Sequence, residues 1–395
     1  MPPKSWLAAV GKIAARLEGE VDRAKYSVLG KLGPNAPPRI FPYRGYGTAE
    51  SIWVTGRVLR DVPEAKASAD ATAWQNLLAT ARRFETDEVP GARVLLRAGN
   101  ISRQVAADDE GYFDCTLQGA TPAPLGDGWH TVEAELVHPA GADSPHALMP
   151  VLIPPASATF GVISDIDDTV VQTEATKLVA MARTVFLGNA RTRLPFKGVA
   201  AFYRALRAGT GGAESNPLFY VSSSPWNLYD LLVEYLELQQ IPLGPIMLRD
   251  WGISNDEIIP ATHATHKRSA IDRILAAYPK LPFVLIGDSG QEDPEIYAQV
   301  IRDFPGRIRV AYIRSVDRSE QRVGAIRALA EDLARTGGVL LLTDDTLAAA
   351  KHAAAAGWIA ATTLGEIDLE TAADAGVPAA EKEVAARAGL EPEKK

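Results

Sequence analysis

Residues 156–375 alternate short apolar runs with segments of helical character, and this alternation restricts the fold more than any other feature of the chain. The apolar runs are Phe160–Ser164, Leu218–Ser222, Phe283–Gly287, Ile308–Ile313 and Val339–Thr343. The helical segments between them include Glu174–Leu187, Val199–Ala208, Leu228–Gln239 and Lys267–Ala277. Strands that are buried on both faces appear in sequence as continuous apolar runs, and alternation with helices is typical of a parallel sheet. The pattern therefore predicts a doubly wound parallel α/β sheet.

The composition is that of a globular chain and argues against several classes of protein. The 395 residues carry 41 Lys and Arg against 49 Asp and Glu, a net charge of −8, whereas proteins that coat nucleic acid usually carry a basic stripe. Cys115 is the single cysteine, which excludes an intramolecular disulfide and a CxxC zinc site. No apolar run reaches the roughly 18 residues of a membrane-spanning helix, and the first residues lack the apolar core of a signal peptide. We expect a cytoplasmic protein, soluble or peripheral on a membrane, with no nucleic-acid partner.

Residues 1–47 are expected to form an amphipathic helix followed by a proline-rich connector. Apolar residues recur at helical spacing from Leu7 to Val28, and residues 1–31 contain six Lys or Arg against three Asp or Glu. A helix with an apolar stripe and positive charge can lie on a membrane surface. A helix docked on its own protein has the same pattern and is the more frequent case, so both interpretations stay open. Gly33–Pro42 is expected to be the extended connector.

Residues 48–155 have the pattern of a β-sandwich-like domain. Ser51–Arg60, Ala92–Ala98, Tyr112–Leu117 and Thr131–His138 are β-branched or alternating runs separated by turn signals. A helix is expected within Trp74–Glu88, and the sequence does not indicate a protein partner for this segment. The final residues, 376–395, are rich in Ala, Glu and Lys and are expected to form a polar tail.

Polar residues gather where the predicted strands of the α/β domain end. In chain order they are Asp165, Asp167, Thr169, Ser222, Ser223, His266, Lys267, Asp288 and Asp293. Ligands of a doubly wound sheet lie outside the carboxyl ends of its strands. We therefore expect these side chains to line one site.

This set of side chains suits phosphoryl transfer. One carboxylate can attack phosphorus, and a second carboxylate two residues later can act as an acid and then as a base. A hydroxyl and a lysine can hold the phosphate oxygens. Because gathered carboxylates repel one another unless a cation neutralises them, the charges imply a metal ion, and hard oxygen ligands suit Mg²⁺.

Taken alone, each of these motifs also has an ordinary structural explanation. Aspartates are frequent in turns, and it is the order of the motifs and the strand before them that favour a real site. His263 and His266 could form a zinc pair, but further nitrogen or sulfur ligands are not evident. Thr343–Thr346 superficially repeats the first motif, and capping of a helix by an aspartate explains it better.

The residues and order of these motifs resemble those of a known family. Asp165-x-Asp167-x-Thr169, Ser222, Lys267, and Asp288 with Asp293 resemble the four motifs of the haloacid dehalogenase superfamily of phosphatases. More narrowly, Pro217–Asn227, the pair His266-Lys267 and Gly287–Tyr297 resemble the catalytic domain of the actin-patch phosphatidate phosphatase family. The resemblance covers about Phe160–Ile359 and extends more weakly into the β-rich segment.

The resemblance implies a role for each residue. Asp165 would be the nucleophile, Asp167 the general acid and base, and Thr169 would brace their loop. Ser222 and Lys267 would hold the phosphate, with Ser223 and His266 beside it. The implied magnesium ligands are the side chains of Asp165, Asp288 and Asp293 and the backbone carbonyl of Asp167.

The function implied is that of a magnesium-dependent phosphatidate phosphatase with a haloacid dehalogenase-like fold. The segments Thr169–Leu218 and Ser222–Lys267 are short, so little or no cap domain is expected over the site. An open site accepts a bulky substrate such as a lipid in a membrane, which residues 1–31 could help to reach. A phosphatase of a phosphoprotein or soluble phosphate monoester, and a membrane- or protein-binding module with a vestigial site, remain as alternatives.

Overall fold

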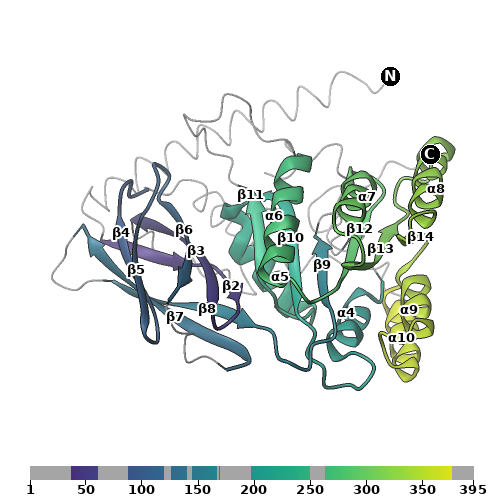
Figure 1. Ribbon diagram of the computed structural model, residues 1–395, viewed down its shortest axis with the longest axis horizontal. Coiled ribbons are helices and arrows are strands. Elements are labelled where there is room, and N and C mark those ends of the chain that lie inside the picture. Colours follow the sequence, from purple (N-terminus) through teal and green to yellow (C-terminus); the bar gives the residue numbers. More distant parts are fainter. Residues whose placement is uncertain are drawn as a thin grey trace, which may run out of the picture.

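The computed structural model describes residues 37–60, 88–119, 126–139, 145–166, 169, 197–249 and 263–375. Two sheets lie beside one another, a β-rich part and a parallel sheet covered by helices (Figure 1). Several expectations fall outside the described residues: the helix in residues 1–31, most of the helix within Trp74–Glu88, the helix Glu174–Leu187, and the tail 376–395. None of the helices in the described ranges is long and apolar enough to cross a membrane.

The β-rich part is one connected sheet of eight strands. The strands are β1 (Pro38–Pro42), β2 (Gly45–Gly47), β3 (Ser51–Arg60), β4 (Arg93–Ala98), β5 (Ile101–Ala106), β6 (Tyr112–Gln118), β7 (Gly128–His138) and β8 (His146–Ile153). The predicted runs at β3, β4, β6 and β7 are strands. The structure differs from two separate sandwich sheets because β2 pairs with both β3 and β8 and so joins the halves. Inward apolar side chains of these strands form a single core.

The second sheet has six strands, all parallel, as the alternating pattern predicted. They are β9 (Gly161–Asp165), β10 (Leu218–Pro225), β11 (Ile246–Arg249), β12 (Phe283–Asp288), β13 (Ile308–Arg314) and β14 (Leu340–Thr343). Their order across the sheet is β11-β10-β9-β12-β13-β14. The strand β11 was not among the apolar runs that the sequence analysis identified.

Helices cover both faces of this sheet (Figure 1). They are α4 (Val199–Ala208), α5 (Tyr229–Leu238), α6 (His263–Ala277), α7 (Asp293–Asp303), α8 (Glu320–Ala334), α9 (Thr346–Ala355) and α10 (Leu364–Ala375), with short 3₁₀ turns η3 (Trp226–Leu228) and η4 (Ala361–Thr363). Neighbouring strand residues alternate between two cores: Val162 packs with α4 and α5 on one face, and Ile163 packs with α6 and α7 on the other. The Asp345 side chain accepts a hydrogen bond from Ala348 N at 2.8 Å, which confirms the predicted N-cap of α9.

The two parts share their cores along one interface. Tyr43 stacks on Trp226 with ring centroids 4.4 Å apart, and Tyr46, 1% exposed, lies 5.4 Å from Phe219. Arg57 donates a hydrogen bond to Asn227 Oδ1 at 2.9 Å. The β-rich part therefore packs directly against the segment that follows β10.

Candidate active site

The order of the parallel strands creates a switch point in the middle of the sheet. From β9 the chain continues through β10 and β11 on one side, and then crosses to β12 on the other side of β9. Adjacent crossovers that leave on opposite sides create a crevice at the carboxyl ends of the two central strands. Asp165 ends β9 and Asp288 ends β12, so the topology places both carboxylates at this crevice.

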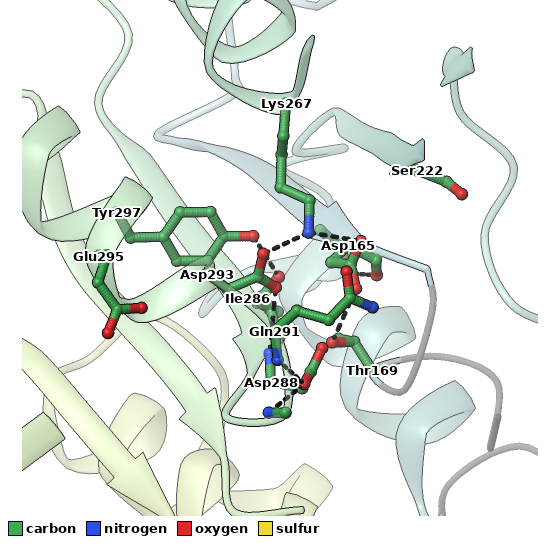
Figure 2. Close-up of polar contacts among 12 residues, drawn as sticks. Asp165, Thr169, Ser222, Lys267, Ile286, Asp288, Gln291, Asp293, Glu295 and Tyr297 are labelled. Atoms are coloured by element: carbon green, nitrogen blue, oxygen red, sulfur yellow. Dashed lines mark hydrogen bonds and ion pairs between the residues drawn. The ribbon is translucent and has the colours of Figure 1, made fainter. Parts of the chain in front are cut away.

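Three aspartates form a compact buried cluster there. Asp165, Asp288 and Asp293 each offer a carboxylate oxygen, and these oxygens lie within 4.8 Å of one another. None of the three residues is more than 1% exposed. Figure 2 shows them converging from β9, β12 and the first turn of α7.

Lys267 of α6 supplies a cation to this cluster. Its Nζ lies 3.1 Å from Asp165 Oδ1 and also pairs with Asp293 Oδ1. Burial acts to lower the pKa of Lys267, but attraction to Asp165 and Asp293 outweighs it and raises that pKa above its ordinary value. The lysine is therefore charged at neutral pH. One cation facing three carboxylates leaves an excess of negative charge in a buried place, which is costly unless a further cation binds.

The loop after β12 holds two of the aspartates in place. Asp288 Oδ1 accepts hydrogen bonds from Gly290 N at 2.6 Å and Gln291 N at 3.2 Å. Asp288 N donates to Asp293 Oδ2 at 3.2 Å. A Cβ atom at Gly287 would overlap the Asp293 carboxylate and the ring of Tyr297. Only glycine fits at this position without displacing Asp293.

The remaining residues that the sequence analysis selected lie at the same edge of the sheet, at different distances from the aspartates. Thr169 Oγ1 donates a long hydrogen bond of 3.5 Å to Asp165 Oδ2. Ser222 is fully buried at β10, where its Oγ accepts a hydrogen bond from Ser224 N at 2.9 Å, and Figure 2 draws it apart from the three aspartates. Ser223 follows it and is 9% exposed. Asp167 lies outside the described residues.

His266 lies on the Ser222 side of the site. Its ring forms a hydrogen bond with the backbone of Ser222. Burial, followed by the positive charges of Arg249, Arg273 and Lys267, lowers the pKa of His266 to about 4. The imidazole is therefore neutral at pH 7.

Residues outside the predicted set also act on the site, through the loop after β12. Arg322 of α8 donates to Ser289 O at 2.7 Å and to Gln291 O at 2.5 Å, and it pairs with Glu295. It thereby holds the loop whose amides bind Asp288. A lone arginine far along the chain gives no signal of this role. Gly287 belongs to the motif Gly287–Tyr297, but the sequence does not show that a larger residue there would collide with Asp293. That requirement comes from the packing of α7 on β12.

The α/β part matches a known family. Residues 160–315 match the family model described as the catalytic domain of phosphatidate phosphatase APP1. This segment is therefore similar to the catalytic domain of the APP1 family. It contains every described residue of the aspartate cluster together with Lys267, and the match ends just after β13.

Two curated proteins are similar to part of this chain. The phosphatidate phosphatase APP1 of Saccharomyces cerevisiae is 35% identical over 161 residues, which is 40% of this chain and 26% of that protein. An uncharacterized protein of Schizosaccharomyces pombe is 32% identical over 160 residues, 40% of this chain and 25% of that protein. The chain thus matches about a quarter of the length of these relatives.

Among solved structures, similarity is weak. A carbohydrate acetylesterase from Xanthomonas citri aligns over 70% of this chain and 68% of its own, with 11% identity and a TM-score of 0.26. A TM-score this low carries no argument about the fold.

Proposed function

We propose that this protein is a magnesium-dependent phosphatidate phosphatase that hydrolyses phosphatidate to diacylglycerol and phosphate. The observation that carries the proposal is the buried group of Asp165, Asp288 and Asp293 around Lys267 at the switch point of the parallel sheet. The APP1 family match over the same residues supports the choice of substrate.

The residues of the chain have complementary roles in the proposed reaction. An Asp165 oxygen attacks phosphorus, and the bond from phosphorus to the leaving alcohol breaks, which leaves phosphate on Asp165. Asp167 gives a proton to the departing alkoxide; this role is assigned by its position two residues after Asp165. Asp167 then takes a proton from a water molecule that attacks phosphorus and releases phosphate. Lys267, held 3.1 Å from Asp165, offsets the charge of the phosphate oxygens.

The donor set fits magnesium. Three buried carboxylates with a single lysine leave room in the charge balance for one divalent cation, and their oxygens are hard ligands. Asp165, Asp288 and Asp293 would hold the ion, together with the backbone carbonyl of Asp167. When bound, Mg²⁺ supplies positive charge against the phosphate oxygens in the transition state.

The proposal extends to the fold and to the place of action. The strand order, with the proposed nucleophile at the end of the central β9, supports a haloacid dehalogenase-like sheet with little or no cap.

We place the protein in the cytoplasm, peripheral on a membrane reached through residues 1–31. Deletion of Met1–Lys31 is then expected to weaken binding to anionic liposomes and leave hydrolysis of a small aryl phosphate unchanged. Equal loss of both would assign these residues to the folded core instead.

Phosphate release from phosphatidate in mixed detergent micelles tests the function beside two soluble monoesters, ethyl phosphate and para-nitrophenyl phosphate. We expect turnover of phosphatidate to disappear after treatment with EDTA and to return with added Mg²⁺. Hydrolysis of soluble esters alone would favour the soluble-substrate alternative. Absence of hydrolysis with every ester would favour a binding module with a vestigial site, and full activity after rigorous chelation would overturn the metal-dependent mechanism.

A further inference from the structure

A pocket lies between the β-rich part and the parallel sheet, and His266 is part of its lining. The volume of the pocket is about 270 Å³. One wall comes from strands β3 and β6, with Trp53, Thr55 and Asp114, and the opposite wall comes from α6 and β11, with Arg273 and Met247. The two parts of the chain therefore build this pocket together, and neither part contains it alone.

Two residues of the lining lie close in sequence to residues of the proposed phosphate site. His266 lines the pocket, and the next residue on α6 is Lys267, which pairs with Asp165. Ser269, Ala270 and Arg273 also line it, and their spacing from His266 puts all four on one face of the helix. Trp226 lines it as well, in the turn η3 that directly follows β10, the strand of Ser222. His266 connects the two places, because its ring lines the pocket and forms a hydrogen bond with the backbone of Ser222.

The lining combines aromatic faces with hydrogen-bonding groups. Trp53 Nε1 donates to Asp114 Oδ2 at 3.3 Å, and the Arg273 guanidinium lies 5.1 Å from the centroid of a Trp53 ring. The neutral His266 ring presents Nε2, a buried atom with no hydrogen-bond partner among the described residues. With carboxylates and a guanidinium in the same lining, the pocket does not favour a second anion. It favours a small neutral group that carries oxygen atoms.

We propose that this pocket binds the glycerol-type alcohol portion of the phosphate ester, while the phosphate lies at Asp165 and Lys267. The inference rests on the proposed phosphatase function and adds the part of the substrate that the pocket recognises. Pockets for drug-sized ligands start at roughly 300 Å³, so a pocket of about 270 Å³ has room for a glycerol-sized group.

The inference gives the β-rich part a role in specificity. The wall that it provides contacts the leaving alcohol and not the phosphate. Changes in the pocket should therefore alter the preference between leaving groups. The same glycerol backbone could come from soluble glycerol 3-phosphate or from phosphatidate, and both are included in the test.

The test uses the full chain and fills the pocket from an exposed position. Ser269 is exposed and lines the pocket, so Ser269→Tyr puts an aromatic ring into it. Ala276→Tyr is the matched control, since Ala276 is exposed on the same helix and is not part of the lining. The specificity constant kcat/KM is measured for glycerol 3-phosphate, phosphatidate in mixed micelles and ethyl phosphate, which lacks the glycerol portion.

We expect Ser269→Tyr to lower the ratio of kcat/KM for glycerol 3-phosphate over ethyl phosphate by about tenfold or more, and Ala276→Tyr to leave it unchanged. Arg273→Gln, at an exposed guanidinium, should lower the same ratio and covers the case in which Ser269→Tyr does not fold. A fall that appears with only one of the two glycerol esters identifies the source of the glycerol backbone. Ratios that stay at the wild-type value for both glycerol esters would overturn the inference and leave the proposed function standing.

If no ester is hydrolysed, the proposed function fails, and calorimetric binding of glycerol 3-phosphate decides the inference separately. Weaker binding to Ser269→Tyr than to Ala276→Tyr would support the pocket. Equal affinity for both variants would reject it.

Discussion

At the scale of single residues, the candidate site is defined by an imbalance of charge. Lys267 is 3% exposed and pairs with Asp165 and Asp293, and Asp288 lies in the same cluster. Removing an aspartate should therefore reduce the excess negative charge of the cluster, and removing the lysine should increase it. Loss of one carboxylate relieves repulsion, whereas loss of the lysine removes the cation that pairs with Asp165 and Asp293.

Asp165→Asn tests this asymmetry and the proposed nucleophile together. We expect phosphatase turnover to fall by at least about 10³-fold, because the amide cannot form the phosphoryl bond. The free energy of unfolding should change little, since Lys267 keeps Asp293 as a partner. Lys267→Met is the comparison: it should destabilise the protein by about 3–5 kcal/mol in the absence of Mg²⁺. Normal turnover of Asp165→Asn, or equal stability of the two variants, would contradict the assignment.

His266 predicts a dependence of stability on pH. Its pKa is lowered to about 4 in the folded protein, while an unfolded chain has the ordinary value near 6.5. Between these values the unfolded chain binds a proton that the folded protein does not, so stability is full above pH 6.5 and decreases as the pH falls towards 4. His266→Gln should remove up to about 2 kcal/mol of the loss between pH 7 and pH 5. Denaturant unfolding at both pH values measures this, and an identical loss in wild type and variant would refute it.

At the scale of helices and strands, the sequence predicted the elements whose pattern is local. Continuous apolar runs revealed β9, β10, β12 and β13, because both faces of these strands are buried, and also the edge strand β14, which is mostly half-buried. The convergence of Asp165, Asp288 and Lys267 followed from the rule that places ligands at the carboxyl ends of parallel strands. Asp165 and Asp288 end strands, whereas Lys267 reaches the same edge from the first turns of α6.

Other elements lacked a local signal. The strand β11 has only four residues and follows the sequence Ile241-Pro-Leu-Gly-Pro245, which indicates a turn. The prolines of Gly33–Pro42 suggested an extended connector, but Pro38–Pro42 forms the strand β1. This strand lies at the edge of its sheet, where prolines are tolerated because not every backbone N–H has to donate a hydrogen bond. The joining of the β-rich part through β2 depends on long-range pairing with β8, which spacing along the chain does not reveal.

Because α7 packs closely on β12, a substitution at Gly287 tests whether the position of Asp293 matters for metal binding. A Cβ there would overlap Asp293 and Tyr297, so Gly287→Ala should displace the aspartate. We expect a loss of stability of about 1–3 kcal/mol from overpacking and a higher Mg²⁺ concentration for half-maximal activity. Gly324→Ala is the control: that glycine is exposed within α8, a Cβ added there would meet open space, and alanine should stabilise the protein by about 0.5–1 kcal/mol. An unchanged Mg²⁺ requirement in Gly287→Ala would show that Asp293 tolerates displacement.

At the scale of the whole molecule, the two sheets are coupled through shared aromatic packing. Tyr46 of β2 packs in the core beneath α6, with its ring centroid 5.1 Å from Trp53 and 5.4 Å from Phe219. Tyr43 packs in the core on the opposite face of the parallel sheet. Interfaces that are apolar and continuous with a core resist independent motion of the parts that they join. The β-rich part is thus expected to unfold together with the α/β part.

Two substitutions test that expectation, one at the interface between the two sheets and one inside the β-rich part. Tyr46→Ala removes a ring that is 1% exposed and should cost about 3–5 kcal/mol, whereas Tyr46→Phe keeps the ring and most of the packing. Leu96→Ala lies within the core of the β-rich part, a cluster that includes no residue of the parallel sheet. If the molecule is one cooperative unit, both alanine variants lower the midpoint of a single transition, seen alike by circular dichroism and by loss of ethyl phosphate hydrolysis. A Leu96→Ala protein that loses β-structure at lower denaturant than it loses hydrolysis would instead show that the parallel sheet folds and works without its neighbour.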